Sequence, residues 1–197
     1  MQCQKLLILC LLSALAHAHN LVDVQKLFPT VAFDIRYATS NNFLKKQIYD
    51  KSGCYLHADA AQALKAVVDE LAQEGLGIKI FDAYHPISMQ CLLTGNCSEA
   101  DLNKRRDKHT RGTAVDLTLI RLSDQSELEM PTEFDAVDEK ASAYYTNVPA
   151  HVLANRTKLQ TVMLKHGFEL SASEWWHFDL KSYAAYPSLD ISLSELP

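Results

Sequence analysis

The chain has 197 residues, is 48% hydrophobic, contains only six glycines and six prolines, and carries a formal charge of −5 at neutral pH. This length and composition predict one globular domain with a substantial core, and they exclude a repeat or low-complexity protein. The acidic balance argues against nucleic acid as a partner.

The first 18 residues differ from the rest. Lys5 precedes the apolar run LLILCLLSALA, and Ala16-His17-Ala18 completes the order of an export signal with its cleavage site. The run is shorter than the roughly 20 residues that span a bilayer. We therefore expect a signal peptide over residues 1–18 and a soluble domain over 19–197 that is exported, periplasmic or secreted, and has no membrane span. Removal of one lysine and no acid would change the charge from −5 to −6.

Three cysteines remain in the expected mature domain. Cys91 and Cys97 flank the turn-rich segment LLTGN, and a disulfide could close it in an oxidising compartment. Cys54 could pair with either of them or stay buried and free. No C-x-x-C pair is present, so a thiolate zinc site is not expected.

The hydrophobic pattern predicts two helices set among strands. TVAFDIRY alternates apolar and polar residues, which predicts a strand near Val31 to Tyr37. Apolar residues then recur at helical spacing from Asp59, the expected N-cap, to Gly75. The remaining predicted elements are strands in IKIFDAY (78–84), GTAVDLTLIRL (112–122) and WWHFDL (175–180), and a helix in NRTKLQTVMLKHGF (155–168) with Gly167 as its C-cap. Without regular β-α-β alternation, this order favours a single α+β domain with helices packed on a largely antiparallel sheet.

The segment DKHTRGTAVDLTL contains the first candidate metal ligands. His109 and Asp116 are seven residues apart, which on a regular strand would direct them to opposite faces. Gly112 lies between them, and a glycine near a strand start can form a bend that redirects the preceding side chain. We therefore expect a loop with His109 that leads into a strand with Asp116.

The segment SEWWHF adds Glu174 and His177. Two imidazoles and one carboxylate are suitable ligands for a catalytic zinc with a fourth position open to water. Glu174 could accept and return a proton during amide hydrolysis. Because Glu174 and His177 share a face only on a helix or across a bend, SASE is predicted to be a loop before the final strand. Taken singly, these residues are more often core or cap residues, but their joint appearance favours a metal site.

These segments resemble the VanX-type D-alanyl-D-alanine dipeptidases, within the wider group of zinc D,D-peptidases. That group has the signature S-x-H-x-x-G-x-A-x-D followed by E-x-x-H, and this chain has DKHTRGTAVD and EWWH. The likeness extends in the same order over most of the mature chain, through DIRYATSNNF, FDAYHP, Phe134-Asp135, Asn155-Arg156, Gly167-Phe168 and EWWHF.

The resemblance implies a role for each matching position. His109, Asp116 and His177 would bind one zinc ion per chain, and Glu174 would be the general base and acid. Asp135 and Tyr37 would face the free ammonium of the substrate.

Two positions depart from the family pattern. His85 stands where the family has an arginine that stabilises the oxyanion, and Asp107 replaces the first serine of the signature, beside the substrate. Together they lower the local charge by up to two units, which favours an ammonium and disfavours a C-terminal carboxylate.

The sequence thus predicts an exported zinc dipeptidase that hydrolyses D-Ala-D-Ala or a related small cell-wall peptide, with His85 as an aid to oxyanion stabilisation. One alternative is a zinc carboxypeptidase or amidase that acts on longer peptidoglycan peptides. Another is a metal-bearing module that binds wall peptides without turnover, although Glu174 argues against it. The sequence does not indicate an oligomeric state.

Overall fold

A computed structural model describes residues 20–95 and 108–197. The expected signal peptide, Cys97 and Asp107 lie outside the described residues. Export, the Cys91–Cys97 disulfide and the role of Asp107 therefore stay predictions. Cys54 is buried, and its thiol forms no disulfide with another described residue.

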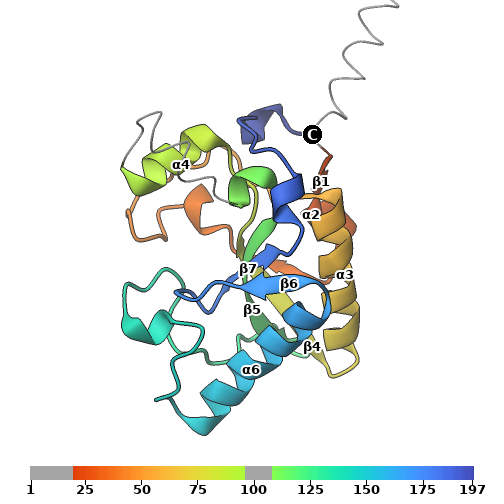
Figure 1. The fold of residues 1–197 in the computed structure, drawn as a ribbon, viewed down its shortest axis with the longest axis vertical. Helices are drawn as coiled ribbons and strands as arrows, with labels where there is room; N and C mark the ends of the chain where they lie inside the picture. The colour runs from red at the N-terminus through yellow and green to blue at the C-terminus, as the bar shows by residue number, and fades with distance from the viewer. Residues whose placement is uncertain (1–19, 96–107) are drawn as a thin grey trace, which may run out of the picture.

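The centre of the domain is a five-stranded sheet with the order β2-β4-β5-β7-β6 (Figure 1). Its strands are β2 (Ala32–Phe33), β4 (Leu76–Asp82), β5 (Ala114–Arg121), β7 (His177–Leu180) and β6 (Phe168–Leu170). Only β2 runs parallel to its neighbour, and the other pairs are antiparallel. The expected largely antiparallel α+β domain is confirmed.

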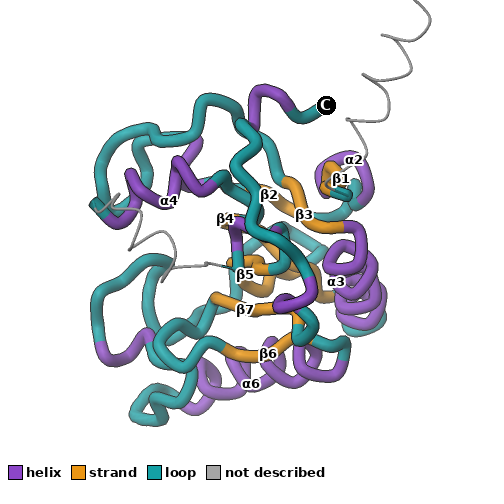
Figure 2. The backbone as a smooth tube through the Cα atoms, turned by 45° about the horizontal axis from the view of Figure 1, so that its top comes forward, coloured by secondary structure: helices purple, strands orange, loops and turns teal. Residues whose placement is uncertain are grey.

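Two long helices bury their apolar sides against this sheet. Helix α3 (Ala58–Ala72) packs on β4, and α6 (Ala150–Lys165) packs on β5, β6 and α3. The buried residues of α3 include Leu64, Val67 and Leu71, which follow the three- and four-residue spacing of one helical face. Figure 2 shows α3 and α6 beside the strands, whereas α4 (Ile87–Thr94) and long loops lie across the sheet from α3.

A smaller antiparallel pair lies next to α3. Strand β1 (Leu21–Asp23) pairs with β3 (Tyr55–His57), and the short α2 (Val24–Leu27) follows β1. The sequence pattern did not predict β1, β3, β6, α2 or α4, because each is short and most are too brief to show a period.

The predicted strands at β4, β5 and β7 and both predicted helices are confirmed, but some boundaries were wrong. The N-cap of α3 lies two residues before the expected Asp59: it is His57, whose Nδ1 accepts a hydrogen bond from the amide of Asp59. Helix α6 begins at Ala150, directly after Pro149. Its C-cap is His166 and not the expected Gly167, which comes next with a φ of +91°.

The predicted strand over Val31 to Tyr37 was largely wrong. Only Ala32 and Phe33 pair with β4, and residues Arg36–Ala38 form a 3-10 turn. The alternating pattern instead reflects burial, since Ile35 and Tyr37 both enter the core from irregular backbone. Tyr37 therefore reaches the site from a turn at the edge of the sheet.

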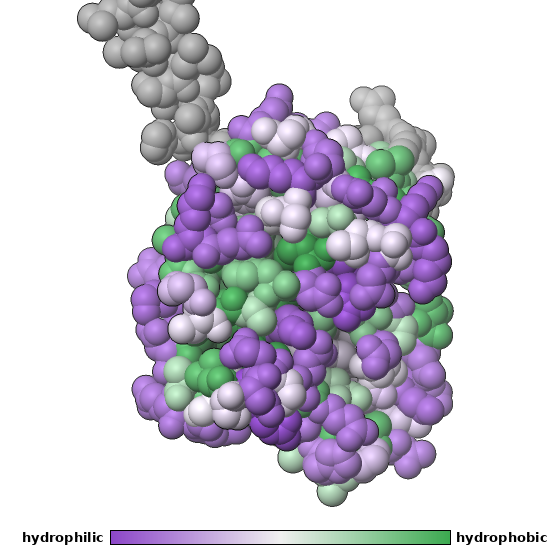
Figure 3. Space-filling model, turned by 180° about the vertical axis from the view of Figure 1, so that it is seen from behind, coloured by the Kyte–Doolittle hydropathy of each residue, from purple (hydrophilic) through white to green (hydrophobic). Residues whose placement is uncertain are grey.

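The face opposite the view of Figure 1 is largely hydrophilic, with small apolar areas between polar side chains (Figure 3). Within the described residues, no helix combines the length and apolar character needed to cross a membrane.

Candidate active site

Three acidic or imidazole side chains lie in a row across the sheet. Asp116 of β5 is directly opposite His177 of β7, and it is also the register partner of Asp82 in β4. An irregularity in β4 between Ile80 and Asp82 shifts the register at that point. Because directly paired residues have Cβ atoms about 4.5–5.5 Å apart, strand pairing alone brings these side chains together.

His109 reaches the same place from a 3-10 turn, His109–Arg111, just before β5. Gly112 ends the turn with a φ of +68°, and an added Cβ there would lie 2.9 Å from the backbone nitrogen of His57. Glycine is thus required by both its conformation and its close approach to β3. The expected bend that aims His109 toward Asp116 is confirmed.

The donor atoms of His109, Asp116 and His177 converge. His109 Nε2 lies 3.4 Å from Asp116 Oδ1 and 3.2 Å from His177 Nδ1, and His177 Nδ1 lies 2.9 Å from the same Asp116 oxygen. Two ligand atoms, each about 2.0–2.1 Å from a tetrahedral zinc, are about 3.3 Å apart. The three side chains therefore fit a single metal ion by both their chemistry and their spacing.

The other nitrogen of each imidazole is held by the protein. His109 Nδ1 lies 2.6 Å from the carbonyl oxygen of Ala83, and His177 Nε2 lies 2.9 Å from Asp179 Oδ1. Lys108 in turn donates to Asp179 Oδ2 at 2.6 Å. Such outer partners orient ligand histidines. Sequence reasoning missed Asp179, although its position two residues after His177 on a strand places both on one face.

The charges of this cluster suit a cation. Burial alone would raise the pKa of Asp116, but the flanking His109 and His177 lower it to about 2. Burial likewise opposes ionisation of Asp179, yet His177 and Lys108 hold its pKa below the usual range. Burial lowers the pKa of His177, but Asp116 and Asp179 outweigh it and raise the pKa well above the usual value. A metal ion would displace the proton that the two carboxylates stabilise on His177.

His85 lies beside the ligands, as predicted, within a second group of possible ligands formed by Asp82, His85 and His109. Its ring stacks on that of His109, with centroids 5.1 Å apart. The Tyr49 hydroxyl donates to Asp82 Oδ1 at 2.8 Å and lies 2.9 Å from His85 Nδ1, while His85 Nε2 lies 2.6 Å from Gln90 Oε1. Tyr49 and Gln90, which belong to neither group, contact the two ring nitrogens of His85, whereas His109 Nε2 and His177 Nδ1 face other members of the first group. The first group is therefore the better metal site. Tyr49 and Gln90 were not predicted, and no local pattern distinguishes them.

The remaining predicted residues that the structure describes line the same pocket. A pocket of about 300 Å³ contains all three candidate ligands together with His85, Tyr37, Asp135 and Glu174. The Tyr37 hydroxyl donates to Asp135 Oδ2 at 2.7 Å, although 98 residues separate the two. Glu174 lies in a loop before β7, as expected, and its carbonyl accepts a hydrogen bond from the amide of His177.

Asp135 has an unusual environment for a carboxylate. Its backbone φ is +63°, a left-handed conformation that few residues other than glycine, asparagine and aspartate adopt. Burial raises its pKa to about 7, with further contributions from Asp116, Asp82 and Glu174, although the Tyr37 hydroxyl opposes the shift. Such a group gains from a nearby positive charge.

The two tryptophans differ in role. Trp175 is buried and donates from Nε1 to Thr132 Oγ1 at 2.9 Å, so it is a packing residue. Trp176 is also buried, but its ring lines the pocket and packs edge-to-face on Phe134. The cluster in SEWWHF thus combines a core residue, a pocket wall, a ligand and a pocket carboxylate.

Two histidines and one aspartate with oriented imidazoles, next to a carboxylate, define a metallohydrolase type of site. The family model described as "D-ala-D-ala dipeptidase" in peptidase family M15 matches residues 17–108 and 94–191. The chain therefore belongs to the M15 family of D-Ala-D-Ala dipeptidases, which are zinc metallopeptidases.

Curated relatives are similar over most of their length. The D-alanyl-D-alanine dipeptidase of Escherichia coli (strain K12) is 38% identical over 174 residues, covering 86% of this chain and 89% of the relative. Enzymes of the same name from Streptomyces coelicolor and Enterococcus faecium are 31% and 28% identical, each covering 80% of this chain and 90% and 89% of the relative.

Solved structures show a weaker likeness. The LD-carboxypeptidase LdcB is 19% identical with a TM-score of 0.40, over 66% of this chain and 63% of that protein. A variant of the D,D-pentapeptidase VanY in complex with Zn(II) is 13% identical with a TM-score of 0.39, over 70% of this chain and 79% of that protein.

Proposed function

We propose that this protein is an exported zinc dipeptidase that hydrolyses D-Ala-D-Ala or a closely related small cell-wall peptide. The observation that carries the proposal is one pocket that contains three converging metal ligands, Glu174, and the hydrogen-bonded pair Tyr37–Asp135. The family and the named activity of its relatives support the reaction class. Export rests on the sequence pattern of residues 1–18.

His109, Asp116 and His177 would hold one zinc ion. When bound, zinc supplies a Lewis acid for the amide carbonyl and lowers the pKa of a coordinated water to about 7. The Asp179 and Ala83 contacts fix the imidazoles, so the ligand geometry exists before the metal arrives.

Protein groups then perform the proton transfers and the binding. Glu174 accepts a proton from the attacking water and passes it to the leaving nitrogen, so it acts first as a general base and then as a general acid. His85 donates to the amide oxygen as negative charge develops there. This role requires its Nε2 to exchange or share the contact with Gln90.

The Tyr37–Asp135 pair supports a substrate with a free amino terminus. Burial and neighbouring carboxylates raise the pKa of Asp135, so a substrate ammonium would stabilise its ionised form. Because Asp135 and the metal ligands line one pocket of about 300 Å³, the ammonium and the scissile amide belong to the same small residue. Longer wall peptides place a neutral amide at that position, which makes carboxypeptidase activity the weaker candidate.

A substrate panel tests the proposal. The zinc-loaded protein should cleave D-Ala-D-Ala, and N-acetyl-D-Ala-D-Ala should be a matched poor substrate because it lacks the ammonium. L-Ala-L-Ala tests stereochemistry, and a wall tripeptide tests the carboxypeptidase alternative. Faster cleavage of the acetylated peptide or the tripeptide would contradict the dipeptidase assignment, and binding without any turnover would favour the non-catalytic module. N-terminal sequencing of native protein tests export, since a chain that still begins at Met1 would contradict cleavage near Ala18.

A further inference from the structure

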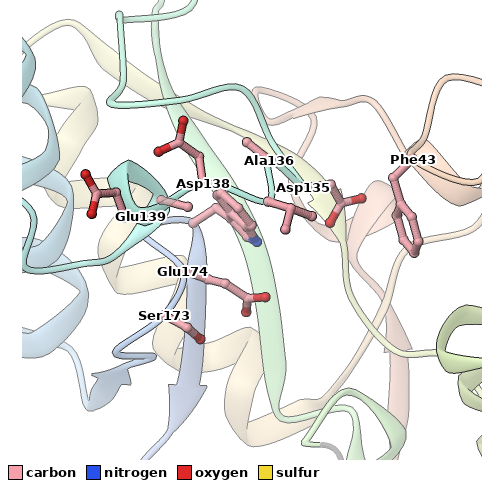
Figure 4. A pocket seen from close by; sticks show the side chains of 10 residues that line it. Phe43, Asp135, Ala136, Asp138, Glu139, Ser173 and Glu174 are labelled. Atoms are coloured by element: carbon pink, nitrogen blue, oxygen red, sulfur yellow. The ribbon is translucent and has the colours of Figure 1, made fainter.

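A cavity of about 320 Å³ lies apart from the active site. The larger cavity of Figure 4, about 500 Å³, shares Asp135 and Glu174 with the metal pocket and is part of the same cleft. The cavity of about 320 Å³ shares no lining residue with either of them. It lies between the start of α3 and the C-terminal segment, and its lining includes Asn20, His57, Asp59, Arg111, Tyr186 and Leu189. A ligand in this Arg111 cavity would be separate from a dipeptide at the metal.

The guanidinium of Arg111 lines this cavity without a counterion among the described residues. Arg111 is only 8% exposed. Its Nη1 donates to the carbonyl oxygens of Tyr183 and Tyr186, whereas Nε and Nη2 have no acceptor in the described part of the chain. A buried cation is costly unless an anion or further acceptors compensate it. An anion bound in the cavity would supply that compensation.

His57 provides a second donor beside the cavity. It is as buried as Arg111, and its ring packs on that of Tyr186 with centroids 4.3 Å apart. Its Nδ1 accepts a hydrogen bond from the amide of Asp59 at 3.2 Å, so the proton of the neutral ring is on Nε2. No described residue accepts from this Nε2. A guanidinium and an imidazole N–H at one cavity, next to the positive end of the α3 dipole, suit a carboxylate.

The same cavity has a negative group at its rim. Asp59 is more than half exposed, and its Oδ2 accepts a hydrogen bond from the Tyr186 hydroxyl at 2.7 Å. Tyr186 therefore contacts both charges, since its carbonyl oxygen accepts from Arg111. A simple carboxylate would be repelled by Asp59, whereas a ligand that also carries an ammonium would pair with both charges. A free α-amino acid has these two groups on one carbon atom.

A single turn joins this cavity to the metal site. Arg111 is the last residue of the 3-10 turn that begins with His109. The amide of His57 donates to the carbonyl oxygen of Gly112 at 2.7 Å, and the amide of Gly112 donates to that of His109 at 2.8 Å. A ligand held by Arg111 and His57 would therefore contact the segment that positions a candidate metal ligand.

We propose that the Arg111 cavity binds a free α-amino acid, with its carboxylate at Arg111 and His57 and its ammonium at Asp59. The site itself does not depend on the proposed function. The choice of D-alanine as the probe does rest on that function, because hydrolysis of D-Ala-D-Ala releases this amino acid. The enzyme then binds its product at a place distinct from the reaction centre.

The test follows backbone amide signals by NMR while zinc-loaded protein is titrated with D-alanine. We expect saturable shifts at Asp59, Arg111 and Leu189. Alaninamide lacks the carboxylate and should bind at least about tenfold more weakly, since hydrogen bonds between charged groups are the strong ones. Propionate lacks the ammonium and should bind about two- to fivefold more weakly, because Asp59 is partly exposed.

Matched variants link the binding to the cavity. His57→Asn keeps a side-chain oxygen that can cap α3 and removes Nε2, so D-alanine should bind about tenfold more weakly. Asp59→Asn should reduce the preference for D-alanine over propionate. Asp69→Asn makes the same change further along α3, outside the cavity, and should leave both affinities unchanged. Zinc content and thermal unfolding verify that each variant folds.

The outcomes separate the site from the proposed function. Shifts confined to residues of the metal pocket, or unchanged binding in His57→Asn, would overturn the site. Propionate or inorganic phosphate binding as tightly as D-alanine would overturn the assignment of the ligand as an amino acid. Binding of D-alanine in this cavity without any turnover of D-Ala-D-Ala would support the site and contradict the proposed function alone.

Discussion

Replacing Asp179 with asparagine should weaken zinc binding while all three ligands stay in place. Asp179 is 1% exposed, and its two oxygens contact His177 Nε2 at 2.9 Å and Lys108 Nζ at 2.6 Å. Asparagine has the same shape but only one oxygen, so it cannot accept from both groups. Its NH₂ group must face either the imidazole or the ammonium, and the negative charge that supports the ligand histidine is lost.

The expected magnitude follows from the role of Asp179 as an outer partner. Loss of such a partner typically lowers metal affinity about 10- to 100-fold, or about 1.4–2.7 kcal/mol. A ligand that binds only the folded state stabilises it in proportion to the logarithm of its concentration over Kd. At equal excess zinc, the zinc-dependent gain in stability should therefore fall by the same amount. For a domain of this size that corresponds to a loss of about 3–10 °C in the zinc-induced rise of Tm.

The assay is a competition titration of zinc against a chelating dye, together with thermal unfolding of metal-free and zinc-loaded protein. The difference between the two unfolding curves isolates metal binding from any effect of Asp179→Asn on the metal-free fold. Lys108→Met is the matched control, because it leaves the Asp179–His177 contact in place. It should change zinc affinity less than about fivefold, since a partly exposed ion pair contributes about 1 kcal/mol or less. Unchanged zinc affinity in Asp179→Asn would show that the orientation of His177 does not depend on Asp179.

Four further predictions concern the pocket itself. His109→Ala or His177→Ala should abolish zinc binding in metal analysis, because two remaining ligands compete poorly with water. Glu174→Gln should retain zinc but lose about 10²- to 10⁴-fold in kcat, the usual contribution of a general base, and near-normal rates would leave Glu174 as a structural residue. Asp135→Asn should raise KM for D-Ala-D-Ala, with Tyr37→Phe as the milder comparison. In metal-free protein at pH values above 7, Asp135→Asn should also have a higher Tm than the unmodified protein. Burial raises the pKa of Asp135 to about 7, so ionising this side chain destabilises the folded state from about pH 4 upward, and the full cost is reached only above pH 7. His85→Arg should raise turnover of D-Ala-D-Ala, since arginine supplies a permanent charge for the oxyanion, and slower turnover by a folded, metal-loaded variant would identify histidine as the working residue of an adapted site.

The metal ligands were predictable because local rules place them. Asp116 and His177 lie on regular strands, and Gly112 marks the bend that redirects His109. The residue types indicate the chemistry of the site. The convergence of the three donor atoms could not be predicted from spacing alone, because it depends on the direct register of β5 with β7.

The substrate end of the pocket could not be predicted in this way. Tyr37 meets Asp135 across 98 residues of sequence, and Tyr49 meets His85 across 36. Each pair joins irregular segments that only the complete fold brings together, and for that reason resemblance, not pattern, suggested Tyr37 and Asp135. The misjudged strand at Val31 to Tyr37 has the same origin, since alternation reports burial and burial does not require a sheet.

The charge balance of the pocket links its two ends. Four carboxylates and three imidazoles line it, with no lysine or arginine among the described lining residues. Burial raises the pKa of Asp135, and the nearby carboxylates of Asp116, Asp82 and Glu174 raise it further. This pocket is therefore short of positive charge. A divalent cation at His109, Asp116 and His177 would oppose those carboxylates, lower the pKa of Asp135 and leave it ionised at neutral pH. The ion would thus prepare the proposed ammonium site as well as the reaction. Metal-free protein should therefore bind D-Ala-D-Ala more weakly, even though zinc and the ammonium would occupy different ends of the pocket.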